Sequence, residues 1–138
     1  MTDLFNKNIQ EHLKVIESLS ILEPNVSNAT AVIVESLKQG GKLMLCGNGG
    51  SAADCQHIAA EFTGRFIQDR RPLAAMALTT CTSALTCISN DYSFTKVFSR
   101  QIEAIGREND GLIAISTSGN SENVIEAIKI AKLFGIKV

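Results

Sequence analysis

The sequence predicts a three-layer α/β/α sandwich around a parallel sheet, preceded by two helices. Short apolar runs alternate with longer amphipathic stretches, which is typical of parallel strands joined by helices. The apolar run at 42–46 has few polar residues, as expected of a strand covered on both faces. Turns rich in small residues follow two of the predicted strands. We expect a single domain over 1–138, with a helical pair in 1–40 and an incomplete parallel core in 41–138.

Composition narrows the classes of function. The chain has 138 residues, of which 45% are hydrophobic and 20% charged, so it can bury a globular core. The net charge of −1 and the lack of a basic run argue against nucleic acid as a partner. No apolar run approaches the roughly 20 residues of a membrane span. The N-terminus does not resemble a signal peptide, so a cytoplasmic protein is expected.

The four cysteines are Cys46, Cys55, Cys81 and Cys87, and none forms a CxxC pair. All four fall within predicted helices or strands. In a cytosolic chain, this pattern favours small buried thiols over a structural zinc site.

Two amphipathic helices are predicted before the first strand, over 3–22 and 25–38. The sequence Leu22-Glu23-Pro24 should end the first helix, because proline disfavours helix at the residue before it. The second should stop at Gln39-Gly40-Gly41. Both helices carry apolar stripes that need a partner, and we hypothesise that this partner is another subunit.

The remaining elements follow from periodicity and turn residues. In order, they are a strand at 42–46, a helix beginning at Ser51, a strand at 73–78, a short helix at 79–89, a break at Asn90-Asp91, a helix at 94–106, a turn at 109–111, a strand at 112–116, a helix at 121–134 capped by Gly135, and the start of a fourth strand at 136–138. Because the chain stops as that strand begins, we expect it to be a fragment of a longer protein.

The first turn after a strand contains Gly47, Asn48, Gly49, Gly50 and Ser51. A helix that begins there presents free N–H groups and a partial positive charge, which suit an anion. Glycine lets a ligand approach the backbone closely. The alternative is an ordinary tight turn in which Ser51 and Asp54 form a capping pair. For this turn alone, the alternative is slightly favoured.

The second turn, Ser116 to Ser121, also follows a strand and opens a helix. It places four hydroxyls, those of Ser116, Thr117, Ser118 and Ser121, beside backbone amides. An ordinary helix cap needs one such residue, whereas a phosphate monoester offers three acceptor oxygens. This turn therefore favours an anion site. In a parallel sheet both turns lie at the carboxyl ends of strands, where ligands usually bind.

One face of the helix after the first turn carries chemically useful side chains. His57 and Glu61 are spaced i, i+4 and are therefore neighbours, and Asp54 and Arg65 are expected to continue the stripe. Such a pair can share a metal ion or a proton. The alternative is a solvated polar face. A further polar pair, Asn90 and Asp91, is equally well explained as a loop breaker.

The sequence segments that carry these features resemble those of a known family. They are CGNGGSAADCQHIAAEFTGR at 46–65, ND at 90–91, FSRQIEAIGRENDGL at 98–112 and ISTSGNSENVIEAI at 115–128. Together they resemble the phosphoheptose isomerases, which act on sedoheptulose 7-phosphate and belong to the sugar isomerase (SIS) domain superfamily. The resemblance covers essentially the whole chain.

The resemblance implies a flavodoxin-like SIS fold. It also implies conversion of sedoheptulose 7-phosphate to D-glycero-D-manno-heptose 7-phosphate, a step toward ADP-heptose and the lipopolysaccharide core. Family members are typically homotetramers with active sites between subunits and one zinc ion per site. By resemblance, the residues have these roles: Ser116, Thr117, Ser118 and Ser121 hold the phosphate; Asn48, Gly49, Gly50, Ser51, Glu61, Asn90 and Asp91 contact the sugar; Glu61 is catalytic; and His57 and Glu61 bind zinc.

The chain departs from the family in length. Members are longer, and their additional C-terminal part supplies a glutamine and a histidine near the metal and a histidine expected as the acid/base partner. Here the only histidines are His12 and His57, and His12 is expected at the surface.

Glu61 is the expected general base, which would remove the proton beside the carbonyl to give an enediolate. A different class remains open: a non-catalytic SIS protein that scaffolds a replication initiator or senses phosphosugars. Such a protein could keep the serine turn but need not keep His57 and Glu61. An isomerase of hexose or pentose phosphates is a second alternative.

Overall fold

The computed structural model describes residues 2–138, which fall into two compact units divided between Val32 and Ile33. The first unit consists of α1 (Thr2–Ser18), the 3-10 turn η1 (Leu19–Leu22) and the beginning of α2 (Glu23–Lys38). The predicted break at 22–24 is therefore only a tightening of the helix. Pro24 lies in the first turn of α2, where its missing N–H costs nothing.

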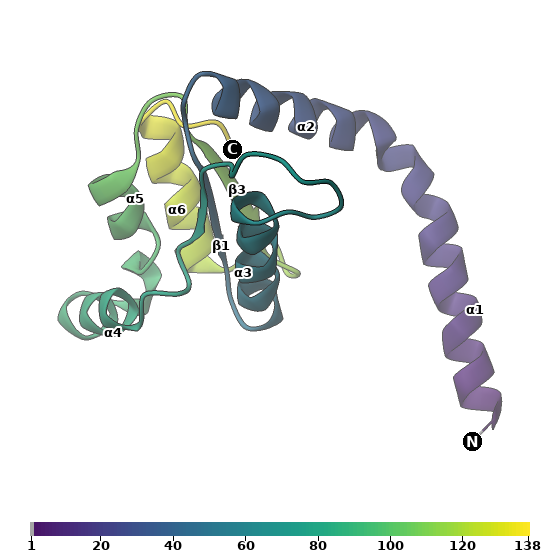
Figure 1. Ribbon diagram of the computed structural model, residues 1–138. Helices are drawn as coiled ribbons and strands as arrows, with labels where there is room; N and C mark the ends of the chain where they lie inside the picture. The colour runs from purple at the N-terminus through teal and green to yellow at the C-terminus, as the bar shows by residue number, and fades with distance from the viewer. Residues whose placement is uncertain (1) are drawn as a thin grey trace. The chain divides into compact units, whose positions relative to one another are not determined.

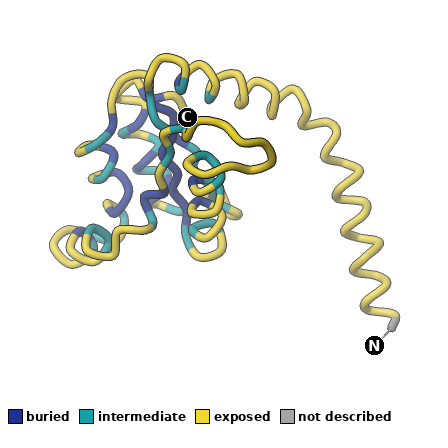
Figure 2. Tube along the Cα trace, viewed as in Figure 1, coloured by how far each residue is buried: buried dark blue, intermediate teal, exposed yellow. Residues whose placement is uncertain are grey.

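The helices of the first unit are exposed along their length (Figure 2). The large apolar side chains exposed on α1 are Leu4, Phe5, Ile9, Leu13, Val15 and Ile16. The stripe predicted from the periodicity consists of Leu4, Ile9, Leu13, Ile16 and Leu19, of which Leu19 lies in η1, and all five are exposed.

The second unit is built on a parallel sheet of three strands in the order β2-β1-β3. The strands are β1 (Leu43–Gly47), β2 (Ala75–Ala77) and β3 (Gly111–Ile115). The strand predicted at 73–78 is shorter than expected, because only three residues of this edge strand pair with β1. The central strand β1 is buried throughout, as its composition predicted.

Helices cover both faces of this sheet (Figure 1). On one face α3 (Gly50–Thr63) packs against Leu43, Leu45 and Ala77. The other face is covered by α4 (Thr82–Asp91), the 3-10 turn η2 (Phe94–Lys96), α5 (Ser99–Ile105) and α6 (Glu122–Leu133). This arrangement confirms the predicted three-layer sandwich.

Several predicted boundaries were wrong. Asn90 and Asp91 do not break a helix but form the last turn of α4, with the Tyr92 N–H donating to the Ile88 carbonyl. The helix predicted at 94–106 is divided into η2 and α5. Val97 and Phe98, which lie between η2 and α5, are buried in the core.

The predicted ends of the second unit are confirmed. Gly135, at a φ of 72°, follows α6, and Asn109, at a φ of 74°, lies in the turn before β3. Lys137 forms a parallel bridge with Gly111, so a fourth strand begins beside β3 as expected. Within the described residues, no helix is both long and apolar enough to cross a membrane.

Candidate functional site

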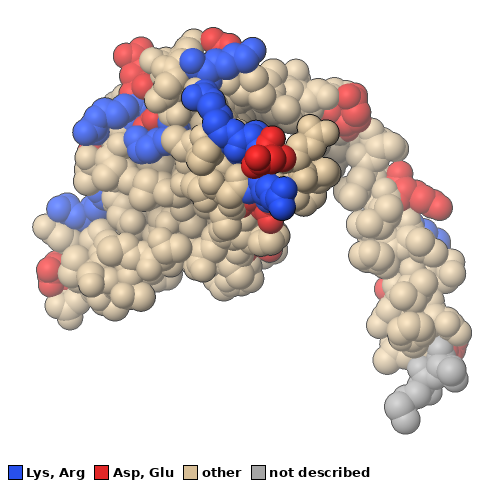
Figure 3. All heavy atoms as spheres, in the orientation of Figure 1, with Lys and Arg blue, Asp and Glu red and all other residues tan. Residues whose placement is uncertain are grey.

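The two predicted anion turns begin at neighbouring points of the sheet. Strands β1 and β3 are paired in parallel, and the last matched residues are Gly47 and Ile115. Both turns therefore lie at the carboxyl edge, where α3 and α6 begin. At this end of the unit, near the start of α3, the visible surface is mainly uncharged (Figure 3). An anion bound there would rely on hydrogen bonds and helix ends.

The first turn is held by close contacts. A Cβ on Gly47 would lie 2.9 Å from the Ser51 Cβ and 3.0 Å from the Ile115 carbonyl oxygen, so only glycine fits. Gly49 is the N-cap of α3 at a φ of 56° and brings no side chain to cap the helix. The predicted Ser51–Asp54 cap is wrong, because α3 begins at Gly50 and Ser51 already lies inside it.

In the second turn, three serine hydroxyls lie close together. The Ser116 Oγ lies 3.0 Å from the Ser121 Oγ and 3.4 Å from the Ser118 Oγ, and the Ser118 Oγ accepts from the Asn120 N–H at 3.2 Å. Ser121 is the N-cap of α6, but its side chain makes no capping hydrogen bond within the described chain. Thr117 is exposed. The first-turn N–H groups of α6 thus lie beside three converging hydroxyls, which is suitable for a phosphate.

A pair of amides joins the two turns. The Asn48 Nδ2 donates to the Asn123 Oδ1, and the Asn123 Nδ2 donates to the Asn48 Oδ1, both at 2.9 Å. Sequence reasoning missed Asn123. The available signal was its spacing, because Asn123, Ala127 and Ala131 form a buried i, i+4, i+8 stripe in which a polar residue needs a partner.

A cavity of about 160 Å³ lies beside the first turn. It is lined by Gly47, Asn48, Gly49, Ala52, Thr79, Leu85, Phe94 and Phe98. Thr79 follows β2, so the cavity lies between the first turn and the α4–η2 region. Asn90 and Asp91 do not line it. They hydrogen-bond to each other at the end of α4, and Asp91 lines a different cavity of about 560 Å³ between α4 and α5.

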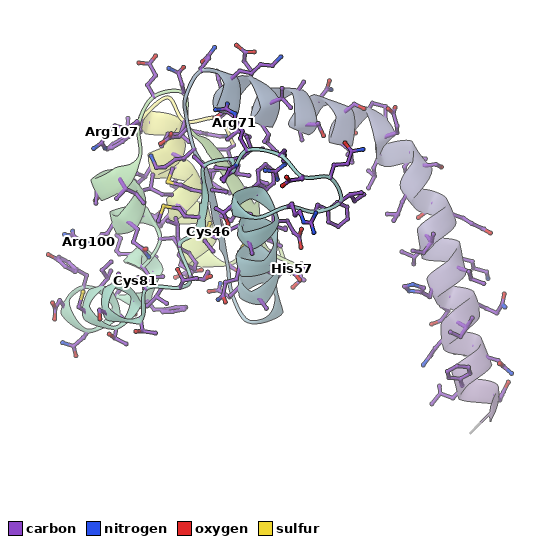
Figure 4. The ribbon with its side chains drawn as sticks, viewed as in Figure 1. Cys46, His57, Arg71, Cys81, Arg100 and Arg107 are labelled. Carbon is purple, nitrogen blue, oxygen red and sulfur yellow. The ribbon has the colours of Figure 1, made fainter. Side chains whose placement is uncertain are left out.

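His57 and Glu61 are brought together on α3 as the spacing predicted. The His57 Nε2 lies 3.7 Å from the Glu61 Oε1, and the side chains are 77% and 31% exposed. His57 projects into solvent on the side of α3 away from β1 (Figure 4). The stripe does not extend to Arg65, because α3 ends at Thr63.

The second carboxylate oxygen of Glu61 indicates that this pair can bind a ligand. Its Oε2 is buried and has no hydrogen-bond partner among the described residues. A buried carboxylate oxygen without a donor is costly, so a cation or ligand donor would be favourable there. With the neighbouring imidazole, it offers the nitrogen and oxygen donors that zinc accepts. The pair therefore fits a zinc site in part, although no group of three such ligands occurs in the described chain.

The structure does not bring Glu61 next to the turns. Glu61 lies eleven positions after Gly50 in the same helix, which corresponds to roughly 16 Å along the axis. The two turns and the His57–Glu61 pair are thus separate features of one chain.

Comparison with known proteins identifies the family. The SIS domain family matches residues 5–138. The phosphoheptose isomerase of Campylobacter jejuni subsp. jejuni serotype O:6 is 56% identical over 132 residues, which are 96% of this chain and 71% of that protein. The phosphoheptose isomerase of Aliarcobacter butzleri is 57% identical over 124 residues, covering 90% and 64% of the two chains.

The solved structures that resemble this chain are also phosphoheptose isomerases. A phosphoheptose isomerase from Francisella tularensis superposes with a TM-score of 0.93 at 36% identity, covering 99% of this chain and 72% of that one. The phosphoheptose isomerase from Neisseria gonorrhoeae gives a TM-score of 0.82 at 49% identity, covering 98% and 68%. With its turns, its sheet order and these matches, the chain belongs to the phosphoheptose isomerases of the SIS domain family.

Proposed function

We propose that the protein is an aldose–ketose isomerase that converts sedoheptulose 7-phosphate to D-glycero-D-manno-heptose 7-phosphate. The observation that carries this proposal is the second turn, where three serine hydroxyls converge at the uncapped N-terminus of α6. The identity to phosphoheptose isomerases supports a heptose as the sugar.

The two turns would share the binding of substrate. Ser116, Thr117, Ser118 and Ser121 would hold the phosphate, and the turn from Asn48 to Ser51, which the Asn48–Asn123 amide pair links to α6, would contact the sugar. Anchoring the phosphate fixes the reacting carbons at a set distance, so that binding energy from the unreactive end helps catalysis. Asn90 and Asp91 are proposed to contact the sugar on the basis of the family resemblance alone.

Glu61 is the proposed general base. Its carboxylate takes the proton from the carbon beside the carbonyl and returns it to the neighbouring carbon. The isomerisation is complete when a proton has also passed from the hydroxyl oxygen to the former carbonyl oxygen. His57 and the free Oε2 of Glu61 would hold the zinc ion, and the ion would stabilise negative charge developing on the substrate oxygen.

Glu61 and the turns would meet in an assembly of subunits. A homotetramer is proposed because α1 exposes an apolar stripe and because Glu61 lies far from the turns of its own chain. A cytoplasmic location and a place in ADP-heptose and lipopolysaccharide core biosynthesis complete the proposal.

The direct test is turnover of sedoheptulose 7-phosphate by the full-length protein, followed by the appearance of the heptose aldose. Sedoheptulose without its phosphate should be a poor substrate, because the serine turn then has no ligand. Preference for a hexose or pentose phosphate would instead favour the second alternative. Binding of phosphosugars with no turnover of any would favour the non-catalytic class. Treatment with a chelator, followed by zinc, tests the metal.

The catalytic residue has its own test. We expect Glu61→Gln to lower kcat by about 10²–10⁴, as is typical when a general base is lost. In zinc-free protein the melting temperature should not fall, because the Glu61 Oε2 makes no hydrogen bond that the amide would break. Glu103→Gln, an exposed carboxylate on α5, is the matched control and should retain full activity. Wild-type turnover by Glu61→Gln would disprove the assignment.

A further inference from the structure

The amide pair between Asn48 and Asn123 is buried and reciprocal. Each side chain donates to the other at 2.9 Å, and Asn123 is only 3% exposed. A primary amide has two N–H donors and two acceptor lone pairs. The pair therefore uses one donor of each residue and leaves the second N–H of Asn48, which is half-buried, for another partner.

The position of the pair matters more than its burial. Asn48 directly follows β1 in the turn that opens α3, and Asn123 lies in the first turn of α6. The two residues are 75 positions apart in sequence. The pair thus ties the first turn to the helix whose N-terminus carries the serine turn.

The first turn is held at two points, by packing at Gly47 and by the amide pair. Gly47 is closely packed between Ser51 and the Ile115 carbonyl, so the first turn is fixed where it leaves the sheet. Beyond Gly47, the Asn48 side chain is what anchors the turn to α6. The other hydrogen bonds of the turn run to its own helix, because the Asn48 and Gly49 carbonyls accept from the Ala52 N–H and the Gly49 carbonyl also accepts from the Ala53 N–H.

We propose that Asn123 is a positioning residue for the isomerase. It acts through Asn48, holding the first turn in register with the Ser116–Ser121 turn so that the sugar and the phosphate are bound at once. It does not touch the substrate, because its own amide is buried against Asn48. The inference rests on the proposed function for its kinetic consequences, but its structural consequence is independent of substrate.

The kinetic test compares Asn123→Ala with a matched control. Gln101→Ala also removes a half-buried amide that makes two hydrogen bonds, to the Leu78 and Val97 carbonyls, but Gln101 and both of these partners belong to neither turn. We expect both variants to lose thermal stability. Only Asn123→Ala should raise KM for sedoheptulose 7-phosphate, by about tenfold, with a smaller change in kcat.

A double-mutant cycle separates action through Asn48 from a general effect. In an Asn48→Ala background, Asn123→Ala should cause little further loss of kcat/KM, because its partner is already absent. Additive losses would overturn the proposal, as would a KM increase in Gln101→Ala equal to that in Asn123→Ala. If Asn123→Ala does not fold, Asn123→Asp keeps the side-chain volume and one hydrogen bond, and it should raise KM in the same direction.

Amide hydrogen exchange gives a readout that needs no turnover. Asn123→Ala should speed exchange in the segment 47–53, while Gln101→Ala should leave that segment unchanged. Unchanged exchange in Asn123→Ala would overturn the inference even if the enzyme is active. If the wild-type protein shows no isomerase activity, the proposed function fails, and the exchange result alone decides the role of Asn123.

Discussion

At the residue scale, two glycines of the first turn differ in the space around them. At Gly47 there is no room for a side chain, because a Cβ would meet Ser51 and the Ile115 carbonyl. At Gly50 there is room, because no atom lies within 4 Å of a built Cβ. Gly50 is also the first residue of α3, with no positive φ. The two glycines should therefore respond differently to the same substitution.

We expect Gly47→Ala to destabilise the protein by about 1–3 kcal/mol through overpacking. Gly50→Ala should leave stability unchanged or raise it by about 0.4–1 kcal/mol, because alanine restricts the unfolded chain. If substrate approaches the Gly50 backbone, Gly50→Ala should nevertheless raise KM. Thermal unfolding and steady-state kinetics on both variants check this, and a stable Gly50→Ala with wild-type KM would contradict the proposed contact.

The cysteines also divide by environment. The prediction that all four are buried was half wrong, because Cys46 and Cys55 are buried but Cys81 and Cys87 are exposed. Burial raises the pKa of Cys46 to about 12, with a smaller contribution from Cys55. Burial, followed by the charge of Asp54, raises the pKa of Cys55 to about 11.

Alkylation at pH 8 should therefore label Cys81 and Cys87 first. The thiolate is the reactive form, and a pKa of about 12 leaves roughly one Cys46 thiol in ten thousand ionised at pH 8. Raising the pH increases that fraction, so labelling of Cys46 and Cys55 should grow only in strongly alkaline solution or on unfolding. Peptide mass spectrometry after brief iodoacetamide treatment measures the order, and early labelling of Cys46 would contradict it.

At the scale of elements, one carboxylate joins the beginnings of β1 and β3. Asp110 is 2% exposed and accepts hydrogen bonds from the Lys42 N–H at 2.9 Å, the Lys42 Nζ and the Arg107 N–H at 2.8 Å. It thereby fixes both strands at the edge opposite the site.

We expect Asp110→Ala to lower the free energy of unfolding by about 2–4 kcal/mol, because three donors lose a buried charged acceptor. The control is Glu11→Gln, which breaks the exposed Lys7–Glu11 pair on α1 and should change stability by less than about 0.5 kcal/mol. Urea unfolding measures both. Equal effects of the two substitutions would show that Asp110 is not a structural anchor.

At the scale of the whole molecule, the exposed apolar stripe of α1 is the feature most in need of a partner. Leu13 and Ile16 are about half exposed, and Leu4 and Phe5 more so. Contiguous apolar surface of this kind is typical of an interface. A second copy of the chain is the partner that the proposed homotetramer would supply.

The double variant Leu13→Asp, Ile16→Asp should therefore dissociate the oligomer and, if sites form between subunits, lower activity with it. Lys14→Ala, a change to an exposed charged residue of the same helix, should leave the assembly intact. Light scattering after size exclusion measures the mass. An unchanged mass for the double variant would exclude α1 as the interface.

Patterns that are local in sequence predicted most of the fold and the serine turn. The apolar run that became β1, the i, i+4 spacing of His57 and Glu61 and the hydroxyls from Ser116 to Ser121 each follow from neighbouring residues. The helix boundary predicted at 22–24 was wrong because Pro24 falls in the first turn of α2, where its missing N–H is not needed. The break predicted at 90–91 was wrong because Asn90 and Asp91 continue α4 to its last turn.

Only the tertiary structure decided the relations between distant residues. The amide pair of Asn48 and Asn123 spans 75 positions, and it exists because β1 and β3 are adjacent in the sheet. That the Glu61 Oε2 is buried without a partner likewise became visible only in the folded chain. By itself, the sequence determined which residues can bind and react. The packing of helices on the sheet determined which of them meet, because contacts between distant residues form only when the core is assembled.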